Sequence, residues 1–219
     1  MIDKIVKRGY HSKHRELITQ VEVPVKYGSL SAFYIDTNYN AVKPYHIIKG
    51  IITAKELSEA DFNIDTVTQM LRDIDDDAHQ KDYICRCLFV IWEDNKGNKL
   101  IAKGGDGVNF FTIDNAWDEP SPTRICAFPN QSEKWMYVGS GACLPLVELV
   151  DEDNAILIQT DETMFYLNSK AKGSTFDMFE TYKDLIAEAK YGEVLDMINF
   201  DFMISKRPPS KDLFLAFVH

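Results

Sequence analysis

The sequence predicts an α+β protein, built mostly from antiparallel strands, with about three helices packed outside the sheet or sheets. Three observations support this prediction. Hydrophobic residues make up 45% and aromatic residues 12% of the 219-residue chain, which is enough to bury a core. Short apolar runs are joined by glycine-containing turns, which is typical of antiparallel hairpins. Strands and helices do not alternate regularly, and this disfavours a doubly wound dinucleotide-binding fold.

The first half of the chain is predicted to contain a hairpin, one helix and four further strands. Valines alternate with polar residues before Gly28, and a second apolar run follows it, so residues 18–36 indicate a hairpin. Apolar residues at helical spacing predict a helix over residues 58–74. Further strands are expected at residues 47–52, 83–92, 99–103 and 108–113, the last entered through the glycine-rich turn 104–107.

The second half is predicted to hold shorter strands and the strongest helix. Helices are expected at 142–150 and 174–197, the longer one broken or kinked at Gly192. Strands are expected near 124–128 and 134–138, as a hairpin at 156–161 and 163–168, and as a closing strand at 213–218. No linker or repeat divides the chain, so residues 1–219 are predicted to form one domain.

The charge is unevenly distributed. The chain has 34 acidic and 24 basic residues, a net charge of −10, which argues against a partner such as duplex nucleic acid. Residues 1–15 contain five basic residues and one acidic residue, and are interpreted as a basic N-terminal arm. The other 204 residues therefore carry −14, and residues 135–169 contain no lysine or arginine.

Two acidic runs are the predicted binding residues. They are Asp73, Asp75, Asp76 and Asp77 in the first run and Asp151, Glu152 and Asp153 in the second. The first run is not a calcium loop, because Ala78 stands where the sharp turn needs glycine and Ile84 where a bidentate glutamate is needed. The leading hypothesis is a non-enzymatic interaction or regulatory protein, like small bacterial or phage accessory proteins. It would bind a basic patch of a protein partner.

No metal site, cofactor or membrane segment is predicted. Cys85 and Cys87 lie in an apolar run without the paired Cys/His clusters of a zinc site, so buried free thiols are expected. No stretch approaches the roughly 20 apolar residues of a membrane span, and no signal peptide opens the chain, so a cytoplasmic protein is expected. The oligomeric state stays open, with self-association as one alternative.

Cys143 is a weaker catalytic candidate. It follows Gly139-Ser140-Gly141 at a predicted strand-to-helix junction, where a helix dipole would lower the pKa of a thiol. A transferase or hydrolase using this thiol is therefore one hypothesis. The alternative, which the sequence favours, is a tight turn with a buried cysteine. The other glycine-rich segment, 104–107, lacks the Lys-Ser/Thr of a phosphate-binding loop and is interpreted as a hairpin turn.

Residues 88–150 resemble proteasome-type N-terminal-nucleophile hydrolases. The resemblance rests on the run 88–107 (LFVIWEDNKGNKLIAKGGDG) and on MYVGSG at 136–141. It implies a four-layer αββα sandwich, with Thr19 as the nucleophile, Asp36, and Lys49 or Lys43. Ile18 precedes Thr19 where the family has a glycine, so the resemblance implies a degenerate peptidase or amidohydrolase as the alternative function.

Overall fold

The computed structural model describes residues 2–7, 17–23, 25, 28–36, 62–114, 121–125, 138–141, 143–151, 154–171, 175–204 and 212–219. These residues form ten strands and four helices. In chain order they are β1 (Ile2–Lys7), β2 (Leu17–Val23), β3 (Ser29–Asp36), α2 (Ile64–Gln80), β4 (Cys87–Glu93), β5 (Lys99–Gly105), β6 (Val108–Asp114), β7 (Ser121–Ile125), β8 (Leu146–Val150), β9 (Asn154–Thr160), α3 (Asp161–Ala171), α4 (Thr175–Ala187), α5 (Tyr191–Ile204) and β10 (Leu213–Val218).

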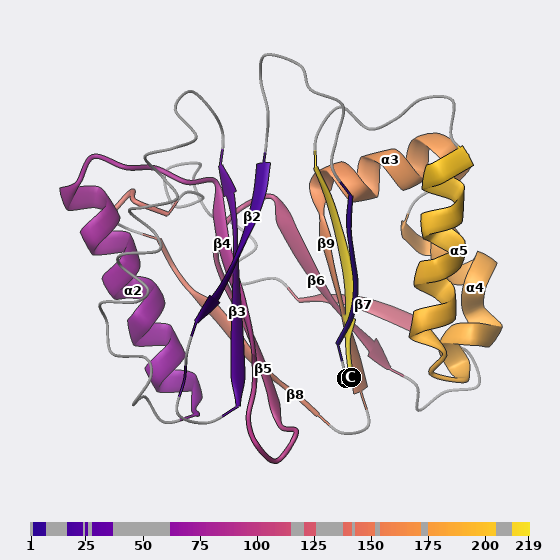
Figure 1. The fold of residues 1–219 in the computed structure, drawn as a ribbon, viewed down its shortest axis with the longest axis horizontal. Coiled ribbons are helices and arrows are strands. Elements are labelled where there is room, and N and C mark those ends of the chain that lie inside the picture. The colour runs from indigo at the N-terminus through magenta and orange to yellow at the C-terminus, as the bar shows by residue number, and fades with distance from the viewer. Residues whose placement is uncertain are drawn as a thin grey trace. The chain divides into compact units, whose positions relative to one another are not determined.

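The chain divides into two compact units, each built on one antiparallel sheet (Figure 1). The first unit comprises Met1–Lys13, Val108–Ile125 and Asp151–His219, and its strand order is β1-β10-β9-β6-β7. The second comprises His14–Gly107 and Cys126–Val150, and its order is β2-β3-β4-β5-β8. The prediction of an α+β protein with mostly antiparallel sheets is therefore confirmed. The assignment of residues 1–219 to one domain stays a prediction.

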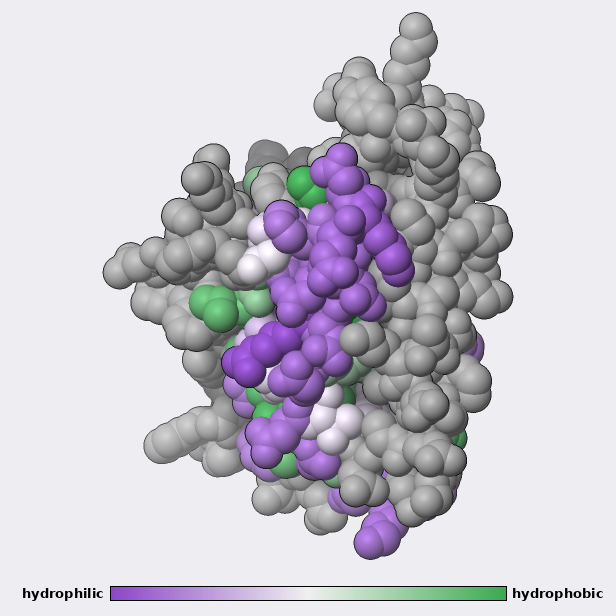
Figure 2. Space-filling model, turned by 90° about the vertical axis from the view of Figure 1, so that its left-hand side faces the viewer, coloured by the Kyte–Doolittle hydropathy of each residue, from purple (hydrophilic) through white to green (hydrophobic). Residues whose placement is uncertain are grey.

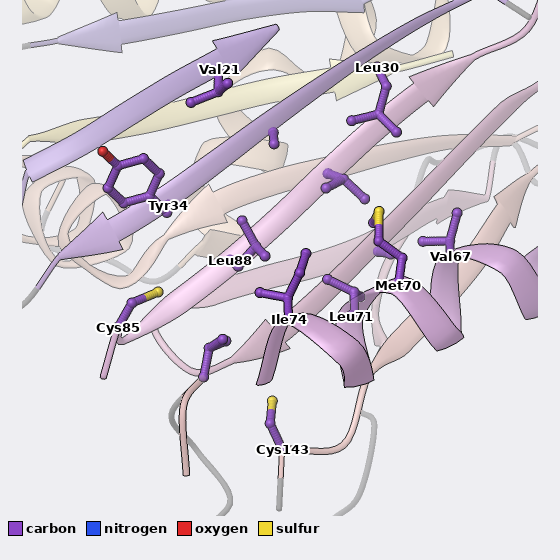
Figure 3. Close-up of a cluster of buried hydrophobic side chains, with 14 of the residues drawn as sticks. Val21, Leu30, Tyr34, Val67, Met70, Leu71, Ile74, Cys85, Leu88 and Cys143 are labelled. Carbon is purple, nitrogen blue, oxygen red and sulfur yellow. The ribbon is translucent and has the colours of Figure 1, made fainter. Parts of the chain in front are cut away.

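In the second unit, α2 covers one face of the sheet. The apolar side chains of the helix, among them Met70 and Ile74, point at strand residues such as Leu88 (Figure 3). Trp92 is fully buried in the same cluster, with Phe62 against its ring at 5.2 Å between centroids. Asn63 begins the helix, because its side-chain oxygen accepts a hydrogen bond from the Thr66 amide at 2.7 Å.

In the first unit, α3, α4 and α5 contribute side chains to a separate core over β6, β9 and β10. Tyr191 of α5 stacks on Phe217 of β10 with ring centroids 4.8 Å apart. The predicted helix over 174–197 is two helices, and the interruption lies at residues 188–190 rather than at Gly192. Ala189 has φ +54° at this break, a left-handed conformation that ends a helix.

Two predicted elements are wrong. Residues 163–168, expected as a strand, belong to α3, and residues 146–150, expected as part of a helix, form β8. Asp161 and Glu162 lie in the first turn of α3, where negative charge favours a helix through its dipole. β8 pairs along its whole length with β5, from Lys99 opposite Val150 to Lys103 opposite Leu146, so the neighbouring strand decides its conformation.

The beginning of the predicted basic arm is strand β1. It lies at the edge of its sheet and pairs antiparallel with β10, from Ile2 opposite Val218 to Lys7 opposite Leu213. Asp3 Oδ2 also lies 3.0 Å from His219 Nε2. Residues 8–15 of the arm and the predicted strands at 47–52 and 134–137 lie outside the described residues.

Gly28 and Gly97 offer a matched test of backbone crowding in the second unit. Both have positive φ, +79° and +88°, but a Cβ at Gly28 would lie 1.7 Å from the Glu93 carbonyl oxygen and one at Gly97 would meet nothing within 4 Å. Gly28→Ala should therefore lose about 1 to 2 kcal/mol more unfolding free energy than Gly97→Ala, as measured by urea denaturation. Equal losses would contradict the close approach of β3 to the β4–β5 turn.

Candidate functional site

Polar side chains gather where β6, β9 and β10 lie side by side in the first unit. Four of them are at most 4% exposed, although the sheet around them is apolar: Asn109, Thr160, Thr163 and Asp212. Asp161, the first residue of α3, is half-buried beside them. Because burying a polar group is costly unless it is hydrogen-bonded, such a cluster indicates either a structural network or a site.

Two threonines tie the start of α3 to β10. Thr160 acts as the N-cap of α3, with its hydroxyl oxygen 3.3 Å from the Thr163 amide that donates to it. The Thr163 hydroxyl donates to the Phe214 carbonyl at 2.9 Å and accepts from the Phe214 amide at 3.0 Å. The helix therefore begins at a fixed position relative to the adjacent strand.

This arrangement brings two carboxylates to the same end of neighbouring strands. Gln159 of β9 lies opposite Leu215 of β10 in the antiparallel register. Asp161 begins α3 directly after β9, and Asp212 directly precedes β10, so both residues lie at the end where these antiparallel strands adjoin. Asp212 is 4% exposed.

Asn109 adds a third strand to the same site. It lies on β6, opposite Gln159 of β9, and its side-chain amide Nδ2 donates to Asp161 Oδ1 at 2.7 Å. The carboxyl group of Asp161 is thus fixed by a buried neighbour from another strand. We call Asn109, Thr160, Asp161, Thr163 and Asp212 the β9–β10 site.

Sequence reasoning missed this site. The sequence predicts Asp161 at the end of a hairpin strand and places Asp212 just before the closing strand, and no catalytic motif includes either residue. The position of each residue along the chain does give a hint. Asp161 comes after the apolar run 155–158 and two polar residues, and Asp212 directly precedes the closing strand. The pairing of β9 with β10 brings them together, and neither position reveals that pairing.

One of the acidic residues predicted to bind a partner is buried. Asp75 is 3% exposed, and its carboxylate accepts hydrogen bonds from the amides of Gly139 at 2.5 Å, Ser140 at 3.1 Å and Cys143 at 2.9 Å. Its assignment to an exposed acidic surface is wrong. The outer side of α2 is hydrophilic (Figure 2). It carries exposed Asp76 and half-buried Asp73 and Asp77, and Asp151 is exposed, while Glu152 and Asp153 lie outside the described residues.

The residues assigned to an N-terminal-nucleophile site lie on strands. Thr19 is in the interior of β2, opposite Tyr34, and Asp36 is the last residue of β3, opposite Leu17. Lys43 and Lys49 lie outside the described residues.

Cys143 is buried next to the turn at residues 139–141, as the favoured interpretation of the sequence predicts, and not at the start of a helix. No helix follows it: residues 144 and 145 lead into β8. Burial, followed by the charge of Asp75, raises the pKa of the Cys143 thiol to about 12. The backbone amides of Gly139, Ser140 and Cys143 donate to the Asp75 carboxylate.

The thiol of Cys143 should therefore resist alkylation. A pKa of about 12 in place of the usual 9.0 lowers its thiolate fraction at neutral pH about 1,000-fold. We expect iodoacetamide at pH 7.5 to leave Cys143 unmodified in the folded chain and to modify it fully in urea, as read by peptide mass mapping. Rapid labelling of the folded chain would revive the hypothesis of a cysteine nucleophile.

Three solved structures share this fold along almost the whole chain. RsbX in complex with magnesium is 11% identical, with 99% of this chain and 94% of that chain covered and a TM-score of 0.55. The catalytic domain of the serine/threonine protein phosphatase PstP with two manganese ions is 9% identical, with coverages of 99% and 96% and a TM-score of 0.56. The PP2C phosphatase domain of SpoIIE from Bacillus subtilis is 11% identical, with coverages of 99% and 62% and a TM-score of 0.55.

These likenesses correct the sequence-based hypotheses. The fold is that of PP2C-type phosphatases, not of proteasome-type N-terminal-nucleophile hydrolases, so the resemblance of residues 88–150 was wrong. The functions predicted from the sequence, a non-enzymatic bacterial or phage accessory protein and a degenerate peptidase or amidohydrolase, are overturned by the same neighbours.

No family model and no curated protein matches the sequence. Among the helices described, none is long and apolar enough to cross a membrane.

Proposed function

We propose that this chain is a metal-dependent phosphatase domain that removes phosphate from phosphoserine or phosphothreonine in a protein. The observation that carries the proposal is the pair of carboxylates, Asp161 and Asp212, at the adjoining ends of β9 and β10. Support comes from the PP2C-type fold, because two of the structures that share it contain magnesium or manganese. The phosphorylated protein would be the partner of the chain.

The β9–β10 site fits such an ion by its donor atoms. Carboxylate oxygens are the ligands that magnesium and manganese prefer, and magnesium is commonly held by one or two carboxylates together with water and substrate phosphate. Among the described residues no group of three or more His, Cys, Asp or Glu residues is placed to hold a metal. Of the carboxylates at the adjoining ends of β9 and β10, we propose Asp161 and Asp212 as the ligands.

Each residue of the site has a distinct part in this proposal. A bound divalent ion supplies charge that polarises the phosphoryl oxygens and lowers the pKa of a bound water. Asp161 and Asp212 would hold the ion. The Thr160 and Thr163 hydroxyls, 2.8 Å apart, keep the first turn of α3 against β10, so the two carboxylates stay together.

We also propose that the protein acts in the cytoplasm. Cys87 and Cys143 are free thiols. Unpaired buried cysteines are usual in reducing compartments, where disulfides are rare.

The test is a phosphatase assay on the full chain. With Mn²⁺, we expect hydrolysis of p-nitrophenyl phosphate and release of phosphate from a phosphothreonine peptide, and we expect EDTA to abolish both. Asp161→Asn and Asp212→Asn should each lower kcat/KM about 100-fold or more, because each loses a metal ligand. The control is Asp196→Asn, which changes an exposed carboxylate on α5 and should leave the rate unchanged.

Folding of the variants is checked by circular dichroism and thermal denaturation in EDTA. Wild-type activity that survives EDTA, or folded Asp161→Asn and Asp212→Asn proteins with wild-type activity, would refute the proposal. A folded wild-type chain with no phosphatase activity on either substrate would refute it as well.

A further inference from the structure

Asn109 is a buried polar residue on an otherwise apolar strand face. The side chains of Phe111 and Ile113, which follow it at a spacing of two along β6, belong to the core beneath the helices. Asn109 itself is 4% exposed. A side-chain amide in such a place costs free energy unless its hydrogen bonds are satisfied, and Asn109 Nδ2 donates to Asp161 Oδ1 at 2.7 Å.

The geometry of this hydrogen bond restricts Asp161. A carboxylate at the start of a helix can rotate about its side-chain torsions, and a donor on a neighbouring strand limits that rotation. β6 is rigidly paired with β9 from Val108 opposite Thr160 to Asp114 opposite Asn154. The donor therefore has a fixed position relative to the residue that precedes Asp161.

We propose that Asn109 is a positioning residue: its amide orients the Asp161 carboxylate for a divalent cation and so raises the affinity of the β9–β10 site for that cation. This inference rests on the proposed function, since it assigns a metal to Asp161. In metal sites, partners that hydrogen-bond to a ligand typically contribute 10- to 100-fold in metal affinity. Asn109 acts through Asp161 and is not itself assigned as a ligand.

Two substitutions separate this role from a structural one. Asn109→Leu keeps a side chain of similar size and removes the donor. The control is Thr112→Ala, on the same strand and half-buried, whose side chain points to the opposite face from Asn109.

The measurement is calorimetric titration of MnCl₂ into the metal-free full chain. We expect Kd to rise about 10- to 100-fold in Asn109→Leu and to stay unchanged in Thr112→Ala. In the phosphatase assay, the Mn²⁺ concentration that gives half-maximal activity should rise by the same factor, while kcat at saturating Mn²⁺ changes little. A residue that only stabilised the fold would lower the unfolding temperature in EDTA without moving the Mn²⁺ dependence of the folded protein.

A second measurement needs no variant. In the ¹⁵N-labelled wild-type chain, the side-chain NH₂ resonances of Asn109 should shift when MgCl₂ is added, because their acceptor becomes a metal ligand. A wild-type chain that binds neither Mn²⁺ nor Mg²⁺ would overturn the proposed function and this inference together. Binding by the wild type with unshifted Asn109 resonances, or with the same Kd in the folded Asn109→Leu variant, would overturn this inference alone.

Discussion

Replacing Asp75 by alanine is expected to lower the free energy of unfolding by about 3 to 4 kcal/mol. The carboxylate is 3% exposed and accepts hydrogen bonds from three backbone amides, those of Gly139, Ser140 and Cys143. Removing it leaves these donors without their acceptor next to the core, and it releases segment 138–143 from α2. Urea denaturation of the full chain measures the loss.

Two further variants make this result specific. Asp76→Ala changes the adjacent exposed carboxylate and should alter stability by no more than about 0.5 kcal/mol. Asp75→Asn keeps the shape but turns part of the acceptor into a donor, and should lose most of what Asp75→Ala loses. Hydrogen exchange at the Gly139, Ser140 and Cys143 amides should accelerate in both Asp75 variants. A stable Asp75→Ala protein with protected amides would refute the buried network.

Replacing Thr163 by valine is expected to cost about 2 to 3 kcal/mol. The side chain is fully buried, and its hydroxyl both donates to and accepts from the backbone of Phe214. Valine fills the same space but makes neither hydrogen bond. The loss of unfolding free energy therefore measures the contribution of the hydroxyl and not that of a cavity. Because this bond joins α3 to β10, the variant should also bind Mn²⁺ more weakly if Asp161 and Asp212 hold the ion.

Thr163→Ser is the matched control for the hydroxyl. It keeps both hydrogen bonds and loses one methyl group, so we expect a loss of about 1 kcal/mol. The two unfolding free energies are compared by urea denaturation. Equal losses in Thr163→Val and Thr163→Ser would show that packing, not the hydroxyl, is what the α3–β10 junction needs.

Where local pattern decides the structure, the sequence predicted it well. The closing strand was expected at residues 213–218, which are the bounds of β10, and the hairpin around Gly28 is β2 and β3. Both β5 and β6 lie where the apolar runs predict them, to within two residues. These elements are short apolar runs bounded by turn residues, so neighbours along the chain are enough to specify them.

Where distant partners decide the structure, prediction failed. The run 163–168 contains threonine, phenylalanine and tyrosine, which are common in strands, yet Thr160 caps a helix there through the Thr163 amide. Asp75 stands among acidic residues that suit a solvated loop, but α2 extends to Gln80, which carries Asp75 on the helix face turned to the core. The β9–β10 site needs a hydrogen bond across 52 residues, from Asn109 to Asp161, which no local pattern encodes.

The pairing of β1 with β10 constrains the order in which the chain can fold during synthesis. β1 (Ile2–Lys7) is made first, and its partner Leu213–Val218 is made some 200 residues later. At ribosomal rates of about 5 to 20 residues per second, the synthesis of β10 follows that of β1 after roughly 10 to 40 s, and β1 has no strand partner during this interval. The second unit needs nothing beyond Val150, so it can fold on the ribosome while the sheet that carries Asp161 is still incomplete. We therefore expect the β9–β10 site to be assembled after the second unit has folded.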